Sequence, residues 1–114
     1  MTQINGVIIH MHNCEMVLNK LASLNDVLEN VIVNSKLNEV SRIVHKYQPH
    51  GLTIVSILEE SHILISTWPE FNYAFVEILL CSDENSIEDI ANFIIDAFKP
   101  SRYDSQQINH KLNI

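Results

Sequence analysis

The 114-residue chain has the length of one ordinary domain, which can bury a single hydrophobic core without disulfides or a structural metal. Apolar residues make up 46% of it and the mean hydropathy is +0.07, which excludes a disordered chain. Fourteen acidic and seven basic residues give a net charge of −7, which argues against nucleic-acid binding, because a phosphate-binding surface needs clustered Lys and Arg.

The first half of the chain predicts a strand, a helix and a second strand. Residues 5–12 are a short apolar run with β-branched side chains, which is typical of a strand. Ser23 and Asp26 fit the S-x-x-D capping box, and apolar residues then recur at helical spacing, so we expect a helix over residues 23–35. Strand-like alternation follows over residues 40–47.

The middle of the chain predicts a turn and three further strands. The turn falls at residues 49–51, where proline and glycine lie close together. The strands are β-branched apolar runs, separated by Glu59-Glu60 and by Pro69-Glu70, at residues 52–58, 62–67 and 72–80.

A second helix is predicted from residue 86. Ser86 and Asp89 form another capping box, and Pro100 ends the helix because proline has no amide proton. The apolar face of this helix is expected to carry Ile87, Ile90, Ile94 and Ala97. The tail has room for one further short strand.

The resulting order is β-α-β-β-β-β-α, which predicts an α+β fold with a mostly antiparallel sheet and both helices on one face. The helix-free face must be polar or covered, and the strands are apolar, so we expect a dimeric α/β sandwich. We find no repeat or linker, and we therefore interpret residues 1–114 as one domain.

Two features bear on the location of the chain in the cell. No apolar run approaches 18 residues and no basic stretch precedes an apolar one at the N-terminus, so we expect neither a membrane span nor a signal peptide. The two cysteines, Cys14 and Cys81, are too few for a disulfide framework and favour a reducing compartment, hence the cytoplasm.

The triplet His10-x-His12-x-Cys14 puts three soft ligands on one face of a strand, which a transition metal can use. The alternative is a strand end whose histidines are solvated or hydrogen-bonded to neighbours. Because the spacing identifies no fourth ligand, we predict no metal.

Cys81 follows an apolar strand and has two interpretations. It can form a nucleophile pair with a distant histidine, or it can be a buried small hydrophobe, which is the commoner role of such a cysteine.

Tyr47, Trp68, Phe71 and Tyr73 form the aromatic group of interest. Packing in the core is the usual role of aromatics in a small domain. Trp68, however, lies where a strand gives way to a turn, and its ring can be partly open there. A ring stacked on a heteroaromatic ligand, with Glu70 accepting from hydroxyl groups, is a second interpretation and predicts a nucleoside site.

Two motifs resemble the small prokaryotic S-adenosylmethionine decarboxylases, which are pyruvoyl-dependent enzymes of spermidine synthesis. The segments Glu60-Ser61-His62 and Thr67-Trp68-Pro69-Glu70 match the family signature E-S-H-x-x-x-H-T-W-P-E, and Cys81 follows Ser61 at the family distance of twenty residues. Residues 45–51, HKYQPHG, are similar to the family segment H-[KR]-F-x-P-x-G. The resemblance runs from about residue 6 to Pro100.

This resemblance implies that the chain cleaves itself between Glu60 and Ser61. The Ser61 hydroxyl would attack the carbonyl of Glu60, and Ser61 would end as a pyruvoyl group that supports the loss of carbon dioxide. Cys81 would donate the proton that replaces the carboxylate.

The resemblance also implies a substrate site. Tyr47 and Trp68 would hold the adenine of S-adenosylmethionine between them, and Glu70 would bind the ribose hydroxyls. A carboxylate there suits a cationic sulfonium substrate.

The chain departs from the family at two positions that serve self-cleavage. Ser66 stands at the position of the family histidine, and Thr53 at that of a family serine. A serine hydroxyl is barely ionised near neutral pH, and losing a general base costs about 10²–10⁴ in rate. The first strand also departs from the family, since residues 10–13 stand where family members tend to carry an acidic and an aromatic residue.

Three functions follow from these matches and departures. The first is decarboxylation of S-adenosylmethionine by a homodimer. The second is an unprocessed, catalytically silent paralogue that binds ligand or pairs with an active relative. The third is a pyruvoyl decarboxylase of arginine or ornithine.

Overall fold

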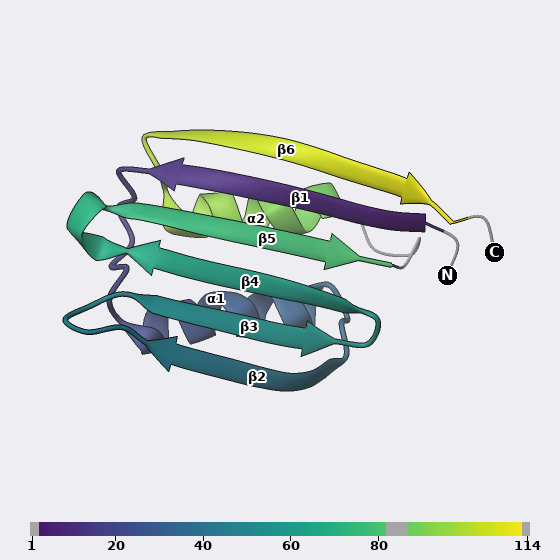
Figure 1. Cartoon of the computed structure of the whole chain (residues 1–114), viewed down its shortest axis with the longest axis horizontal. Helices are drawn as coiled ribbons and strands as arrows, with labels where there is room; N and C mark the ends of the chain where they lie inside the picture. Colours follow the sequence, from purple (N-terminus) through teal and green to yellow (C-terminus); the bar gives the residue numbers. More distant parts are fainter. Residues whose placement is uncertain (1–2, 82–86, 113–114) are drawn as a thin grey trace.

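The computed structural model describes residues 3–81 and 87–112 as an antiparallel sheet with two helices behind it (Figure 1). In chain order, the elements are β1 (Gln3–His12), α1 (Leu21–Asn34), β2 (Glu39–Lys46), β3 (Leu52–Leu58), β4 (Ser61–Trp68), the 3₁₀ helix η1 (Pro69–Phe71), β5 (Tyr73–Leu80), α2 (Ile87–Phe98) and β6 (Arg102–Lys111). The predicted order is confirmed. The tail strand is ten residues long, longer than predicted.

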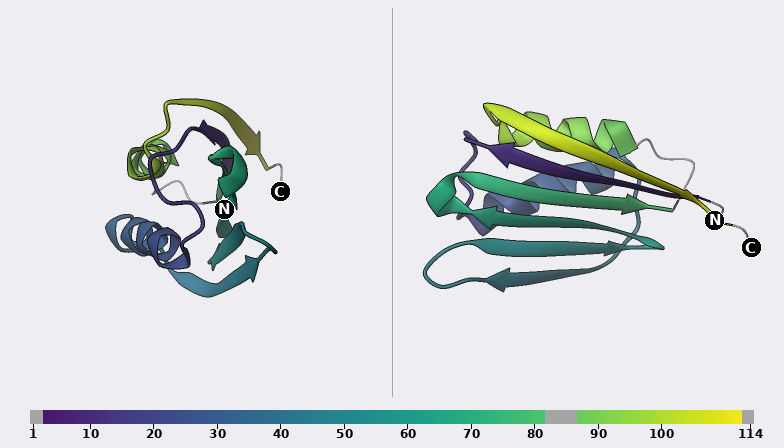
Figure 2. Two further views of the ribbon diagram at one scale, coloured as in Figure 1. Left: turned by 90° about the vertical axis from the view of Figure 1, so that its left-hand side faces the viewer. Right: turned by 45° about the horizontal axis from the view of Figure 1, so that its top comes forward.

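The six strands lie in the order β2-β3-β4-β5-β1-β6, with antiparallel pairing between neighbours. Both helices cover the same face of the sheet, and the other face carries no described helix (Figure 2). This arrangement confirms the α+β fold with helices on one face. Neither described helix is long and apolar enough to cross a membrane.

The hydrophobic core lies between the sheet and the two helices. Side chains in β3, β4 and β5 alternate between buried and partly exposed, because successive residues of a strand point to opposite faces. The buried helix residues are Leu24, Val27, Leu28 and Val31 of α1 and Ile90, Ala91, Ile94 and Phe98 of α2. These buried residues include most of those that the sequence predicts for the apolar faces of the two helices.

The predicted start of the first helix is wrong. Helix α1 begins at Leu21 after Lys20, and no side chain caps it. The Ser23 amide donates to the Lys20 carbonyl oxygen, so Ser23 lies inside the first turn. An earlier start lets Leu21 pack against the core, and such packing outweighs capping in a short helix.

The second helix ends as predicted, but its start is only partly described. Ser86 of the predicted capping box lies outside the described residues. Helix α2 ends at Phe98, where Lys99 takes a φ of 50° just before Pro100.

A cluster around Arg42 joins β2 to α1. Its guanidinium contacts Glu39 Oε2 at 2.8 Å and Glu29 Oε1 of α1 at 2.9 Å. The buried Ser56 hydroxyl donates to Glu39 Oε2 at 2.6 Å. Burial alone raises the pKa of Glu39, but the hydrogen bonds from Arg42 and Ser56 and the charge of Arg42 outweigh it, so this pKa lies below its usual value.

Because the pKa of Glu39 is lower in the folded chain than in the unfolded one, its carboxylate stabilises the fold above the unfolded pKa, near 4.3. That stability is lost as the pH falls through the folded pKa. We therefore expect the free energy of unfolding of the wild type to fall more steeply than that of Glu39→Gln between about pH 6 and pH 3. Urea unfolding at several pH values measures this, and parallel curves would contradict it.

Candidate active site

The residues that the sequence predicts for the site form two groups, at opposite ends of β4 (Figure 1). Ser61 is the first residue of this strand, whereas Ser66 and Trp68 lie near its end. A strand rises about 3.3 Å per residue, so Ser61 and Ser66 are about 16 Å apart. One chain therefore holds the predicted cleavage position and the predicted substrate residues in separate places.

The first group surrounds the turn between β3 and β4. The backbone amide of Cys81, which directly follows β5, donates to Ser61 Oγ at 3.1 Å. Twenty residues separate the two in sequence, and sheet pairing brings them together. Both side chains are half-buried. This contact puts the predicted pyruvoyl precursor beside the predicted proton donor.

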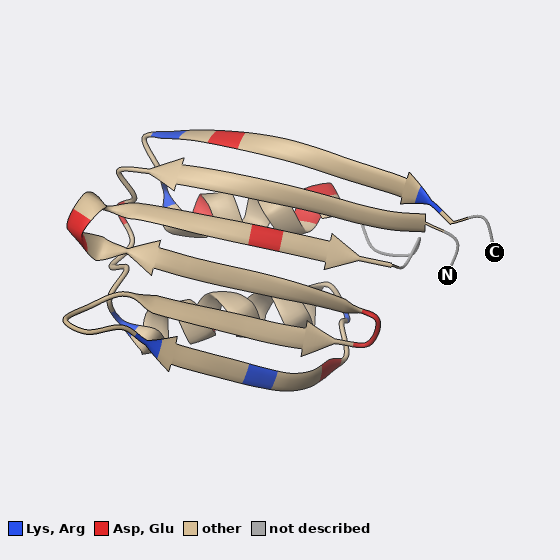
Figure 3. Cartoon of the chain, viewed as in Figure 1, with Lys and Arg blue, Asp and Glu red and all other residues tan. Residues whose placement is uncertain are grey.

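The peptide bond before Ser61 lies in a strained turn. Glu60 has a φ of 61°, in the left-handed region. For a residue with a side chain this conformation costs about 1–2 kcal/mol. Figure 3 shows this acidic turn in red, where the end of β3 meets the start of β4.

The sequence did not indicate a role for His62, which forms a hydrogen-bond contact on the helix-free face. Its Nε2 lies 2.6 Å from Glu77 Oε2 of β5. The spacing alone does not reveal this pair, because it depends on the β4–β5 register.

The second group lines a cleft of about 350 Å³ at the other end of the sheet. The residues around it are Tyr47, Gln48, Pro49, His50, Thr53, Ser66, Thr67, Trp68 and Glu70. The three predicted substrate residues, Tyr47, Trp68 and Glu70, thus share one cleft although they come from two separate segments. The Trp68 side chain is 40% exposed, which leaves its ring open to a ligand.

A chain of three hydroxyl groups lies in this cleft. Tyr47 Oη is 3.0 Å from Thr53 Oγ1, and Thr53 Oγ1 is 2.7 Å from Ser66 Oγ. Thr53 and Ser66 are cross-strand partners in β3 and β4. The two departures that bear on self-cleavage are therefore in direct contact.

The β2–β3 turn positions the aromatic wall of the cleft. The Tyr47 amide donates to the Gly51 carbonyl oxygen at 2.9 Å, and the Gly51 amide donates to Asn19 Oδ1 at 2.9 Å. Gly51 has a φ of 107°, and a Cβ there would lie 3.1 Å from the Thr67 carbonyl oxygen. A side chain at position 51 would disturb this turn.

Some members of the predicted aromatic group pack against neighbouring rings, and others are exposed. Trp68 and Tyr73 pack with their ring centroids 5.3 Å apart, and Tyr73 Oη lies 2.6 Å from His10 Nδ1. Phe71 is 71% exposed, so it is not a core residue. Glu70 Oε1 lies 3.5 Å from His50 Nε2, a contact that the sequence motifs do not predict.

The three soft ligands of the first strand do not share a face. Asn13 takes a φ of 53°, which turns the chain after β1 and buries Cys14 in the core. Burial raises the pKa of the Cys14 thiol to about 11. Within the described residues, no group of three or more His, Cys, Asp or Glu side chains is arranged to hold a metal ion.

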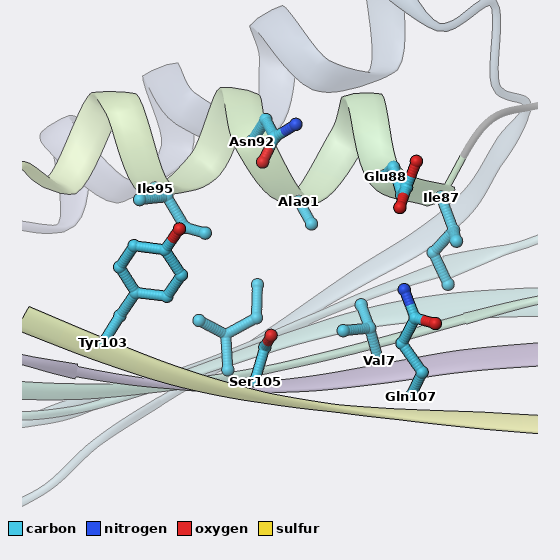
Figure 4. A pocket seen from close by; sticks show the side chains of 10 residues that line it. Val7, Ile87, Glu88, Ala91, Asn92, Ile95, Tyr103, Ser105 and Gln107 are labelled. Atoms are coloured by element: carbon cyan, nitrogen blue, oxygen red, sulfur yellow. The ribbon is translucent and has the colours of Figure 1, made fainter.

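A second cavity, of about 200 Å³, lies between α2, β1 and β6 (Figure 4). Tyr103, Ser105 and Gln107 of β6 face α2 across it. None of the predicted site residues lines it.

Comparison with known proteins places the chain in a family. The model of the family described as S-adenosylmethionine decarboxylase matches residues 5–111. The chain belongs to the S-adenosylmethionine decarboxylase family.

Several named relatives support this assignment. The S-adenosylmethionine decarboxylase proenzyme of Sulfurihydrogenibium sp. is 38% identical over 69% of this chain and 59% of its own length. The proenzyme of Aquifex aeolicus is 34% identical over 78% of this chain and 66% of its own. The chain thus matches less than two thirds of the length of these two decarboxylases.

The fold also matches a solved member of the family. The crystal structure of the adenosylmethionine decarboxylase from Aquifex aeolicus superposes with a TM-score of 0.85 at 27% identity, over 99% of this chain and 92% of that one. This similarity extends over β6, which the sequence motifs do not reach.

Proposed function

We propose that the chain is a proenzyme that cleaves itself between Glu60 and Ser61 and then decarboxylates S-adenosylmethionine. The observation that carries this proposal is the contact between the Cys81 amide and Ser61 Oγ, because it joins the cleavage position to the proton donor. The names of the relatives support the same activity.

Self-cleavage begins with the Ser61 hydroxyl. Its oxygen attacks the carbonyl carbon of Glu60 and the peptide nitrogen leaves, so an ester replaces the amide. The left-handed conformation of Glu60 favours this step, because breaking the peptide releases its strain. The subsequent loss of the residue 61 α-proton breaks the Cβ–O bond and expels the upstream chain as the Glu60 carboxylate. Water then replaces the amino nitrogen of the remaining dehydroalanine, which leaves as ammonia, and residue 61 becomes a ketone.

The residues around Ser61 fit a pyruvoyl group at that position. When present, this group supplies the electron sink for the loss of carbon dioxide. Cys81, held beside residue 61, then supplies the proton that replaces the carboxylate.

The cleft residues bind the substrate. Tyr47 and Trp68 present aromatic rings for the adenine, and the Glu70 carboxylate accepts from the ribose hydroxyls. The carboxylate and the net charge of −7 also favour a cationic substrate. Since arginine and ornithine have no nucleoside for these rings, the cleft favours S-adenosylmethionine.

In a homodimer, the Ser61 group of one chain and the cleft residues of the other can form one site. The helix-free face presents half-buried or exposed apolar side chains, namely Ile8, Ile43, Val55, Ile57, Leu64, Phe75 and Leu79. A twofold axis parallel to this face and perpendicular to the strands would stack two copies of the face, and would bring the Ser61 end of one sheet to the Ser66 end of the other. Each dimer then contains two complete sites.

A silent paralogue is the second candidate, and the absence of an imidazole at position 66 favours it. In that case the chain stays intact and binds ligand in the same cleft, alone or paired with an active relative.

Denaturing mass spectrometry of the purified chain tests the proposal. We expect two fragments, split between Glu60 and Ser61, with a ketone in place of the amino group of the second. Ser61→Ala should remain a single 13.1 kDa species. An intact wild type after long incubation would instead support the silent paralogue. Carbon dioxide release from S-adenosylmethionine, arginine and ornithine, measured side by side, then identifies the substrate.

A further inference from the structure

We propose that Tyr47 and Thr53 act through Ser66 as a proton relay that replaces the family histidine in self-cleavage. This inference rests on the proposed function, and it assigns Tyr47 a second role besides substrate binding. It starts from the unbroken contact of three hydroxyl groups, Tyr47 Oη to Thr53 Oγ1 to Ser66 Oγ, at 3.0 and 2.7 Å.

The ends of this chain differ in exposure. Tyr47 is 48% exposed at the rim of the cleft, whereas Ser66 is half-buried on its wall. A phenol is a stronger acid than an aliphatic alcohol. Because its hydroxyl is the phenol of the three and lies at the exposed end, Tyr47 is the member that exchanges its proton with water and accepts one from Thr53.

The relay balances in protons and electrons. Ser66 Oγ takes the α-proton of the ester-linked residue 61, passes its own proton to Thr53 Oγ1, and Thr53 passes its proton to the Tyr47 phenolate. The electron pair of the broken C–H bond forms the Cα–Cβ double bond, and the Cβ–O bond breaks. The Glu60 carboxylate leaves as the end of the upstream fragment.

This relay must act on the partner subunit. Within one chain Ser61 lies about 16 Å from Ser66, too far for proton transfer. The face-to-face dimer brings the Ser66 end of each sheet to the Ser61 end of the other.

The neighbouring histidines do not fill the position. His45 pairs with Thr53 rather than with Ser66, and its ring packs edge-on against the Tyr47 ring at 4.6 Å. His10 is separated from Ser66 by Phe75, the partner of both in the sheet. His62 is engaged with Glu77. His50, which lines the same cleft, lies 3.5 Å from Glu70. The hydroxyl chain is in direct hydrogen-bond contact with Ser66 and offers the shortest route.

The test follows cleavage of the freshly synthesised full-length chain over time by mass spectrometry. We expect Tyr47→Phe, which keeps the ring, to slow cleavage by at least about tenfold. Thr53→Val should do the same, whereas Thr53→Ser, which keeps the hydroxyl, should restore the rate. Tyr103→Phe on β6 is the matched control and should cleave like the wild type.

Measuring Tyr47→Phe again in the Ser66→His chain distinguishes a proton relay from a purely structural role of Tyr47. In the Ser66→His chain an imidazole takes the α-proton directly, so adding Tyr47→Phe should cost less than about twofold. An equal loss in both backgrounds, or no loss in either, overturns the relay. If neither the wild type nor Ser66→His cleaves, the proposed function fails and the relay fails with it. Thermal melting of each variant identifies any that does not fold.

Discussion

Ser66→His is expected to speed self-cleavage by about 10²-fold, because it puts a general base that is neutral at pH 7 where an alcohol now stands. The side chain of residue 66 lines an open cleft of about 350 Å³, so an imidazole can be accommodated without displacing the core. Mass spectrometry of the freshly made chain, sampled from minutes to days, gives the two rate constants.

Asn30→His is the matched control for this change. Asn30 is exposed on α1, which covers the opposite face of the sheet from the cleft, and a histidine there should leave the rate unaltered. A Ser66→His chain that folds but cleaves no faster would show that the missing base does not limit cleavage.

Leu64→Lys is expected to convert the proposed dimer into monomers and to abolish the proposed decarboxylation. Leu64 lies in the middle of the helix-free face, and its cross-strand neighbours are Val55 and Glu77. In the monomer the new ammonium group can pair with Glu77, so the fold should survive. In the dimer it would be buried against apolar side chains, at a cost of several kcal/mol. Light scattering should give twice 13.1 kDa for the wild type and 13.1 kDa for the variant.

Two controls separate loss of the dimer from other defects. Val33→Lys adds the same charge on α1, where Val33 is 69% exposed, and should remain dimeric and active.

Mixing Ser61→Ala with Glu70→Ala tests the shared site, because a mixed dimer holds one intact site. Random mixing should restore about a quarter of the wild-type activity. No recovery in confirmed mixed dimers would show that each chain carries its own complete site.

The strands and helices could largely be predicted from the sequence. The run at residues 52–58 coincides with β3, and the next two strands differ from the predicted ranges by about one residue at an end. Alternating apolar residues determine these elements, because one face of each strand must be buried. The first helix begins two residues early, since packing of Leu21 outweighs the capping signal of Ser23.

Part of the site follows from the same pattern. Because Glu59 and Glu60 form a two-residue turn, Leu58 pairs with Ser61, and counting back along both strands pairs Thr53 with Ser66. The sequence predicts this turn, and the turn length then sets the register. Thr53 and Ser66 are therefore a single feature of the site, because their hydroxyl groups are in contact.

By itself, the sequence determined the residue types, the strands that carry them and the family. Only the tertiary structure decided which of these residues are in contact. An extended strand keeps Ser61 and Ser66 about 16 Å apart within one motif. Pairing of β4 with β5 and the β2–β3 turn bring Cys81 to Ser61 and Tyr47 to Thr53. The physical reason is that local pattern specifies which face a side chain takes, whereas its neighbours on that face are set by hydrogen-bond register and turn geometry between distant segments.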